Sequence, residues 1–405
     1  MPAQRLPLVW QHDPATYAPA RHRKACRYES YVPAFLHELR LVLSPELSGI
    51  VSDAERAIHA LNTIAQPALA PFARLLLRTE SIASSKVEGL RIGVRELAHA
   101  EAKHRLGHRV GAVSMEVMSN IDAMQHAVDS ATDVSEFSTA HICAIHACLI
   151  ASAANAARIA GQIRTTQNWI GGDDYNPCGA DFVPPPAEYV APLLDDLCVA
   201  INDETLPPLV QAAIVHAQFE TIHPFEDGNG RTGRALVQVV LRRRGLAPDY
   251  VPPISIVLAN AKERYIKGLT DFRDDRVASW VEHFALAAAS ASTLAQSYVR
   301  VVQDLVRHWR ARVTASPEAP RADAAVWALI DVLPGYPAIT APQAAAATGR
   351  GKASTYDALR LLTAAGVLVP MTHSARNQVW EAVGLVDSLA LLEAGIETRA
   401  RKPEQ

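Results

Sequence analysis

The chain has 405 residues, with 39 Lys and Arg against 42 Asp and Glu and a formal net charge of -3 at pH 7. This length exceeds what one hydrophobic core usually organises, so two or three domains are expected. The small net charge excludes a global electrostatic attraction to nucleic acid or to an acidic membrane surface. No apolar run approaches the roughly 18 residues that would span a bilayer, and the N-terminus lacks an apolar signal region. We therefore expect a cytoplasmic protein that does not enter a membrane.

Cysteine usage points to a reducing compartment. The five cysteines are odd in number, and no two of them form a CxxC pair. This pattern argues against a disulfide framework and against a zinc site. We expect reduced, mostly buried thiols at Cys26, Cys143, Cys148, Cys178 and Cys198.

Periodic apolar residues and few aromatics predict an all-α fold. Residues 1–30 show no period and are expected to form an extended arm. Residues 158–186 hold glycines and three consecutive prolines around short β-prone runs, which predicts a small β-hairpin. Helices are predicted at 33–43, 52–63, 67–88, 92–106, through 113–155, at 187–203, 207–221 and 231–244, and as one or two long helices within 276–313.

The C-terminal part has a different pattern after a predicted linker at 315–320. A helix is expected at 321–331, Thr340 can cap a second helix, and a third over 353–365 ends at Gly366. Residues 367–369 and 378–380 are typical of the two strands of a wing. These elements predict a C-terminal winged helix-turn-helix domain.

Residues 223–234 read His-Pro-Phe-Glu-Asp-Gly-Asn-Gly-Arg-Thr-Gly-Arg, between two predicted helices. The main-chain N–H groups of Gly228, Asn229 and Gly230, with the positive end of the second helix, form an anion site. The two glycines allow phosphate oxygens to approach the main chain closely. The loop is therefore expected to bind a phosphate-bearing ligand.

Charged side chains complete this site. Arg231 and Arg234 stand three residues apart, so both guanidinium groups can reach one polyphosphate. Asp227 supplies a carboxylate suited to Mg2+ beside the phosphates. His223 has an ordinary pKa of about 6.5, which suits a general base that accepts a hydroxyl proton near pH 7.

This string resembles the HPFx(D/E)GNGRxxR signature of Fic-domain proteins at every specified position. The resemblance implies a Fic helical core that transfers AMP from ATP, with Mg2+, to a Tyr, Ser or Thr hydroxyl of a protein target or of itself, releasing pyrophosphate. It implies that His223 is the base, that Asp227 holds the metal, and that Arg231 and Arg234 hold the β- and γ-phosphates. Doc-type relatives, which transfer a phosphate, have Lys at the position of Gly230, so this glycine favours AMP transfer.

The predicted hairpin is similar to the target-docking flap of the family. An extended target segment would pair with its main chain and be positioned over His223; a purely structural hairpin is the alternative. The segment 261–269 resembles one that lines the nucleotide pocket, so Tyr265 is a candidate nucleotide contact, with core packing as the alternative. The flap residues expected to dock the target are Asn168, Trp169, Ile170 and Gly171.

Residues 84–89 read Ser-Ser-Lys-Val-Glu-Gly and fit the family's inhibitory (S/T)xxxE(G/N) pattern at Ser84, Glu88 and Gly89. If Glu88 pairs with Arg234, it occupies the guanidinium group that should hold the γ-phosphate, and the enzyme is autoinhibited. An exposed glutamate at a helix end is the alternative. In some relatives the same glutamate orients a water that removes AMP from a modified target, and both directions stay open.

We expect an N-terminal helical region with the arm and the inhibitory helix over 1–110, a Fic core over 111–314, the linker, a winged-helix domain over 321–390 and a polar tail over 391–405. Within 321–385, basic and acidic residues nearly balance, which favours a protein-interaction or dimerisation role over DNA binding. A cluster of Arg350, Lys352 and Arg376 keeps DNA contact open, and a homodimer stays open as well. A DNA-binding regulator whose core senses nucleotide is the alternative of another class, but such a regulator has no need of His223.

Overall fold

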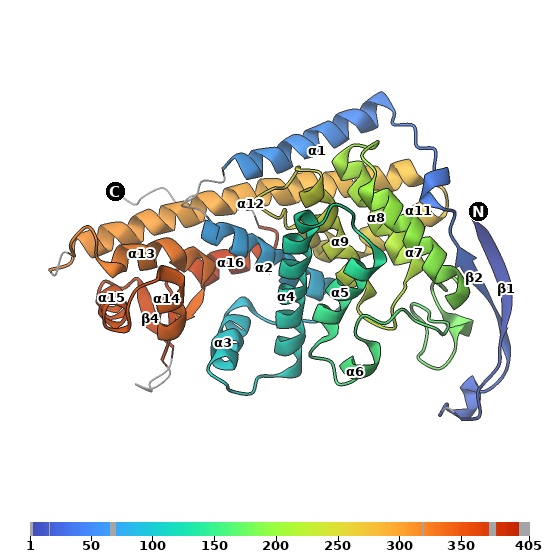
Figure 1. The fold of residues 1–405 in the computed structure, drawn as a ribbon, viewed down its shortest axis with the longest axis horizontal. Coiled ribbons are helices and arrows are strands. Elements are labelled where there is room, and N and C mark those ends of the chain that lie inside the picture. The colour runs from blue at the N-terminus through green and yellow to red at the C-terminus, as the bar shows by residue number, and fades with distance from the viewer. Residues whose placement is uncertain (1–2, 16, 65–69, 318–319, 372–377, 397–405) are drawn as a thin grey trace. The chain divides into compact units, whose positions relative to one another are not determined.

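The computed structural model describes residues 3–15, 17–64, 70–317, 320–371 and 378–396. The chain forms two compact units, each assembled from separate segments. Helices make up most of both units, as predicted, with short antiparallel strands (Figure 1). The first unit comprises Met1–Ser52, Asp122–Leu246 and Glu263–Ala285, and the second comprises Asp53–Ile121, Ala247–Lys262 and Leu286–Gln405. The domain boundaries expected from the sequence stay predictions.

Helix α8 (Pro208–Ile222) is the central helix of the first unit, because every residue from Leu209 to Ile222 is buried. A helix that is buried all round needs neighbours on every side. One of these, α9 (Asn229–Arg243), lies against it so closely that a Cβ on Gly233 would come 2.9 Å from Phe219. Other helices of this unit are α5 (Thr139–Ile150), α6 (Ala156–Ile159), α7 (Ala187–Asn202) and most of α11 (Lys262–Arg273).

The N-terminal arm is a β-hairpin, which the sequence did not predict. Strands β1 (Gln4–Trp10) and β2 (Cys26–Val32) pair antiparallel, with Trp10 opposite Cys26. Exposure alternates along β1 between half-buried and exposed residues. A two-residue period of this kind is weak in sequence when neither face is strongly apolar.

The expectation of reduced thiols is wrong for two of the five cysteines. Cys26 forms a disulfide with Cys178, in the short helix η4 (Pro177–Gly179). Their separation of 152 residues gives no local signal of the pairing. Cys143, Cys148 and Cys198 are free, and burial raises the pKa of the Cys198 thiol to about 11.

In place of the helix predicted over 33–43, the structure has the single turn η2 (Leu36–Glu38). The Leu36 N–H donates to the Asp196 carboxylate at 2.5 Å, and the His37 N–H donates to the same group at 3.5 Å. These N–H groups are therefore satisfied by a side chain of α7 instead of by a longer helix.

The second unit has its core between α2 (Ala70–Val87) and the long α12 (Val277–Thr314), where Leu75, Tyr298 and Trp309 are fully buried. Helices α3 (Val94–Arg105) and α10 (Ile254–Asn260) also belong to it. Three long helices contain residues of both units, namely α1 (Pro45–Thr63), α4 (Ala112–Asp133) and α12.

The C-terminal elements follow the order expected for a winged helix-turn-helix. They form an antiparallel sheet with strand order β3-β5-β4, and Thr340 caps α14 as predicted. Residues 372–377, which include Arg376 of the predicted wing, lie outside the described residues. The elements are α13 (Ala325–Val332), η5 (Leu333–Gly335), β3 (Ala338–Thr340), α14 (Ala341–Thr348), α15 (Lys352–Ala364), β4 (Leu368–Pro370), β5 (Val379–Ala382) and α16 (Leu385–Glu393).

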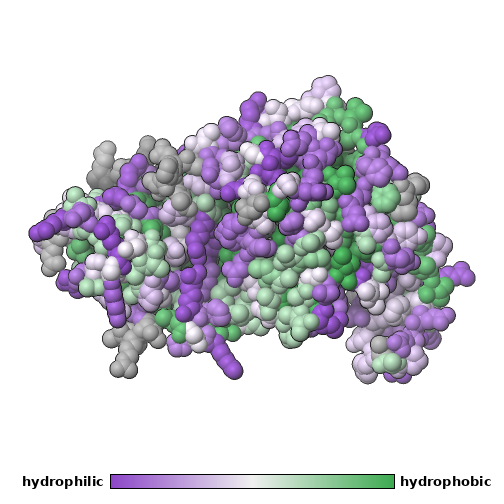
Figure 2. Space-filling view, viewed as in Figure 1, coloured by the Kyte–Doolittle hydropathy of each residue, from purple (hydrophilic) through white to green (hydrophobic). Residues whose placement is uncertain are grey.

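Hydrophilic and apolar residues are interspersed over the face that Figure 2 shows. Among the helices of the described residues, none is long and apolar enough to cross a bilayer.

Candidate active site

His223 lies at the C-terminal cap of α8 in a left-handed conformation, with φ 48° and ψ 60°. A residue other than glycine adopts this region only when its surroundings hold it there. The His223 carbonyl accepts hydrogen bonds from Arg164 Nε at 2.8 Å and from Asn168 Nδ2 at 3.2 Å. Its N–H donates to the Phe219 carbonyl at 2.9 Å. The main chain of the predicted base is therefore fixed on both sides.

Arg164 binds the end of α8, a role that the sequence did not predict. Its Nη2 donates to the carbonyls of Pro185 at 2.6 Å and Ile222 at 3.3 Å. A cation here satisfies carbonyls that the helix leaves unpaired and complements the negative end of the helix dipole. Burial lowers the pKa of Arg164 to about 10, so the group is charged at neutral pH.

The loop after His223 is closed by Asn229. The Asn229 side chain accepts from the Phe225 N–H and donates to the Phe225 carbonyl, both at 2.8 Å. Gly228 has φ +76°, and a Cβ there would lie 3.0 Å from both Leu149 and Ile150. Glycine at 228 is thus required by the backbone conformation and by the neighbouring helix.

The predicted phosphate-binding residues meet at the start of α9. Gly228 is its N-cap, so the main-chain N–H groups of the first turn, including those of Asn229 and Gly230, have no partner within the helix. Arg231 and Arg234 are only 5% and 2% exposed. A polyphosphate bound here would contact both the positive helix end and two guanidinium groups.

Asp227 is the predicted metal ligand, and 65% of its side chain is exposed. One carboxylate oxygen accepts from the Gly228 N–H at 2.6 Å and lies 3.9 Å from Arg231 Nη2. Across the described residues, no three His, Cys, Asp or Glu side chains gather at one point. A single exposed carboxylate fits Mg2+ that is held mainly by substrate phosphates and water.

The predicted hairpin flap narrows to one antiparallel bridge between Ile170 and Phe182. The Ile170 N–H donates to the Phe182 carbonyl at 2.8 Å, and the reverse bond is 3.2 Å. Gly171 has φ +75°, a conformation that favours glycine, and lies beside the Asp181 side chain. Asn168 also donates to the Phe225 carbonyl at 3.0 Å, so the first flap segment is attached to the predicted catalytic loop, residues 223–228.

The N-terminal hairpin supports the flap from its other side. The Tyr31 N–H donates to the Val183 carbonyl at 2.9 Å, and Trp10 packs edge-on against Trp169 with ring centroids 5.8 Å apart. The Arg273 guanidinium group lies 3.6 Å from the Phe182 ring centroid. The flap is therefore held by β2 and by α11.

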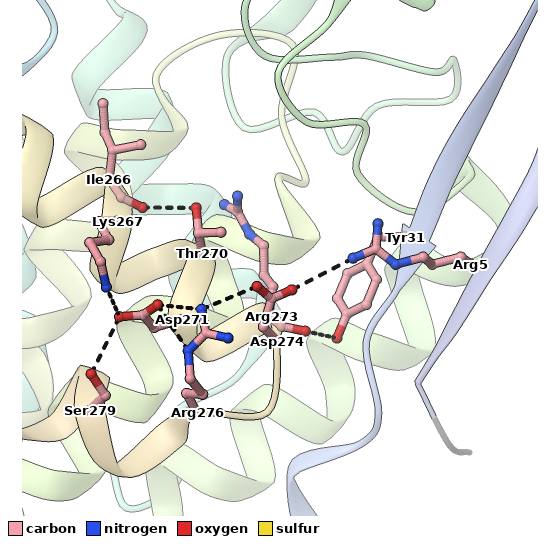
Figure 3. Close-up of polar contacts among 10 residues, drawn as sticks. All are labelled: Arg5, Tyr31, Ile266, Lys267, Thr270, Asp271, Arg273, Asp274, Arg276 and Ser279. Atoms are coloured by element: carbon pink, nitrogen blue, oxygen red, sulfur yellow. Dashed lines mark hydrogen bonds and ion pairs between the residues drawn. The ribbon is translucent and has the colours of Figure 1, made fainter.

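Figure 3 shows the contacts that anchor this end of α11. The Tyr31 hydroxyl donates to the Arg273 carbonyl at 3.0 Å. Asp271 accepts from Lys267 at 2.8 Å and from Arg276 at 2.5 Å, and these hydrogen bonds lower the pKa of its carboxyl group to about 2. The segment that carries Arg273 is fixed by ion pairs and hydrogen bonds.

Tyr265 is buried against His216 of α8. It is 7% exposed, and its hydroxyl is 2.9 Å from His216 Nε2. A nucleotide contact for Tyr265 stays a prediction, and the observed bond assigns its hydroxyl to His216.

The predicted inhibitory residues lie at the end of α2, in the second unit. The helix ends at Val87, and Gly89 follows with φ +88°. The Gly89 N–H donates to the Lys86 carbonyl at 3.0 Å, and the Leu90 N–H donates to the Ser85 carbonyl at 3.1 Å. The helix thus ends at a glycine, as the sequence predicted. Ser84 is buried and Glu88 is exposed.

The catalytic loop falls within a match to a known family model. Residues 136–241 match the Fic/DOC family, and residues 50–129 match the Fic/DOC family N-terminal region. The chain carries a Fic domain. Both helices that flank the loop, except the last two residues of α9, lie within this domain.

Curated relatives match over the Fic domain. The chain is 41% identical over 96 residues to the protein adenylyltransferase fic-1 of Caenorhabditis elegans, which is 23% of this chain and 17% of that protein. It is 37% identical over 101 residues to a probable protein adenylyltransferase of Aquifex aeolicus, which is 24% of this chain and 29% of the relative. The match thus spans less than a third of either relative.

A solved structure matches a larger share of the chain. The crystal structure of a Fic family protein from Desulfovibrio desulfuricans has a TM-score of 0.52 and 22% identity, and the match covers 85% of this chain and 98% of that one. At this identity the likeness shows the fold.

Proposed function

We propose that this chain is a protein adenylyltransferase that transfers AMP from ATP to a Tyr, Ser or Thr hydroxyl of a protein target, or of itself. The observation that carries the proposal is the placement of His223 at the end of α8, beside the start of α9 with its two buried arginines. This arrangement supports a reaction in which His223 acts as a base beside a bound polyphosphate.

His223 and the two arginines have different roles in the proposed reaction. The target hydroxyl oxygen attacks the α-phosphorus, the bond to the bridging oxygen breaks, and pyrophosphate leaves while His223 accepts the hydroxyl proton. Arg231 and Arg234 hold the β- and γ-phosphates, where negative charge accumulates on the leaving group. Mg2+ on Asp227 would neutralise phosphate charge when bound.

The flap is proposed to present the target. Main-chain groups near Asn168, Trp169, Ile170 and Gly171 would pair with an extended target segment. Because Asn168 also bonds the carbonyls of His223 and Phe225, a segment docked there would lie beside the base.

Glu88 is proposed to restrain the enzyme. The sequence motif at 84–89 supports this, and a carboxylate that occupied Arg234 would compete with the γ-phosphate for the guanidinium group. The winged-helix region is proposed to bind protein or a second copy of the chain in preference to DNA.

The test compares ATP labelled on the α-phosphate with ATP labelled on the γ-phosphate, using Glu88→Gly protein and a cell lysate. We expect Glu88→Gly protein to add α-label to protein above the level seen with a Glu88→Gly/His223→Ala control, and the γ-label, which lysate kinases also transfer, to be equal with both proteins. A His223-dependent excess of γ-label would instead indicate phosphoryl transfer. Release of AMP from a pre-modified target, without forward transfer, would favour the hydrolytic direction.

A further inference from the structure

We propose that His146 is a positioning residue that fixes the catalytic loop through the carbonyl of Asp227 and the flap entry through the N–H of Gly161. The proposal rests on the proposed function only for its kinetic consequence. None of the motifs described above includes His146, which lies in the middle of α5 on an apolar stretch.

Both ring nitrogens of His146 are engaged, and the side chain is fully buried. Nε2 lies 2.9 Å from the Asp227 carbonyl oxygen, and the Gly161 N–H donates to Nδ1 at 3.0 Å. A carbonyl can only accept and a main-chain N–H can only donate, so the partners require a proton on Nε2 and a lone pair on Nδ1. One neutral tautomer satisfies both bonds.

The His146 ring also packs against the side chains and main chain of the loop at 223–228. It stacks on Phe225 with a centroid distance of 3.7 Å and an interplanar angle of 0°. Its Cδ2 lies 3.5 Å from where a Cβ on Gly228 would stand. His146 thus contacts the loop at Phe225 and at Asp227, the proposed metal ligand, and lies close to Gly228, where the anion site begins.

These contacts connect three separate segments. Helix α5 carries the ring, the segment from Gly161 leads to Arg164, and Asp227 ends the loop before α9. Because the Asp227 carbonyl is held, the direction of its Cα–Cβ bond and hence the reach of its carboxylate are restricted. Residues that hold a metal-binding side chain in place usually affect how tightly the metal binds.

Two substitutions separate the two bonds. In His146→Gln the amide nitrogen stands near the position of Nε2 and can still donate to Asp227. In His146→Asn the amide oxygen stands near the position of Nδ1 and can still accept from Gly161. Each variant retains one partner and loses the other, so each is the control for the other.

The kinetic test measures AMP transfer in a Glu88→Gly background as Mg2+ is varied. We expect His146→Asn to raise the Mg2+ concentration for half-maximal rate by roughly 10-fold or more, and His146→Gln to change it by less than about 3-fold. Equal Mg2+ requirements in the two variants, or the reverse order, would overturn the proposal.

Amide hydrogen exchange tests the same contacts without any activity. His146→Asn should accelerate exchange mainly at 225–228, and His146→Gln mainly at Gly161. Equal acceleration of both segments in both variants would mean a general loss of packing and would contradict the assignment. If the parent enzyme transferred no nucleotide, the proposed function would fail while this exchange pattern still decided the role of His146.

Discussion

Arg164 Nε donates to the carbonyl oxygen of His223 at 2.8 Å, which ties a buried cation to the main chain of the proposed base. The same guanidinium group binds three further carbonyls, those of Thr166, Pro185 and Ile222. The left-handed conformation of His223 is therefore held by a side chain from the flap entry. The main chain of the proposed base and the segments at both ends of the flap are therefore held by one residue.

Arg164→Lys tests this dependence. A lysine keeps the charge but cannot reach carbonyls in several directions, so buried acceptors lose partners and we expect stability to fall by about 2–4 kcal/mol. Activity at permissive temperature should fall by roughly 10-fold or more, because His223 is no longer fixed. The measurements are thermal unfolding and the AMP-transfer rate. Arg56→Lys, at an exposed ion pair with Asp53 in α1, is the matched control and should leave both unchanged.

Gly233 is expected to be intolerant of a side chain. A Cβ there would lie 2.5 Å from Glu220 Oε1 and 2.9 Å from Phe219, so Gly233→Ala should overpack the contact of α8 and α9 and cost about 1–3 kcal/mol. Gly49 lies in α1 with nothing within 4 Å of where a Cβ would stand, so Gly49→Ala should instead raise stability by about 0.5–1 kcal/mol. Denaturant unfolding of the two variants gives the comparison. A destabilisation of equal size in both would contradict the close approach.

Glu393 is expected to make stability fall as pH rises. Burial raises the pKa of its carboxyl group to about 7 from an ordinary 4.5. The folded state then binds the proton more tightly than the unfolded state, so the stabilisation is present below pH 4.5 and is lost as pH rises to about 7, up to about 3 kcal/mol.

Glu393→Gln removes this titration. The unfolding free energy of the variant should change less with pH than that of the wild type across this window. Near pH 8 it should be higher than that of the wild type. Parallel pH dependences of the two proteins would show that Glu393 is not responsible.

The disulfide between Cys26 and Cys178 joins the N-terminal hairpin to the far end of the flap region. Cys26→Ser removes a constraint on a long loop, so we expect a loss of about 2–5 kcal/mol in oxidised protein. A reductant should lower the melting temperature of the wild type but not of the variant. Cys148→Ser, at a free and half-buried thiol, is the control. Identical melting of wild type with and without reductant would argue against the bond.

The loop at 223–234 could be singled out from sequence because its residues are contiguous and some have a local reason, such as the glycine that a φ of +76° requires at 228; the catalytic roles stay predictions. Gly89 was predictable as a helix end on the same grounds. The turn at Leu36 was not, because a distant carboxylate on Asp196 takes its N–H groups. His146 carried no signal, since its two partners lie 15 and 81 residues away. Contacts between a side chain and a main-chain group that is distant in sequence can be identified only from the folded structure.

Transfer of AMP to protein by His223 is the central claim. The most direct test is mass spectrometry of Glu88→Gly protein after incubation with ATP and lysate, beside a Glu88→Gly/His223→Ala double variant. We predict AMP-modified Tyr, Ser or Thr residues with the first protein and none with the second. AMP modification at equal levels with both proteins, or with neither, would contradict the account.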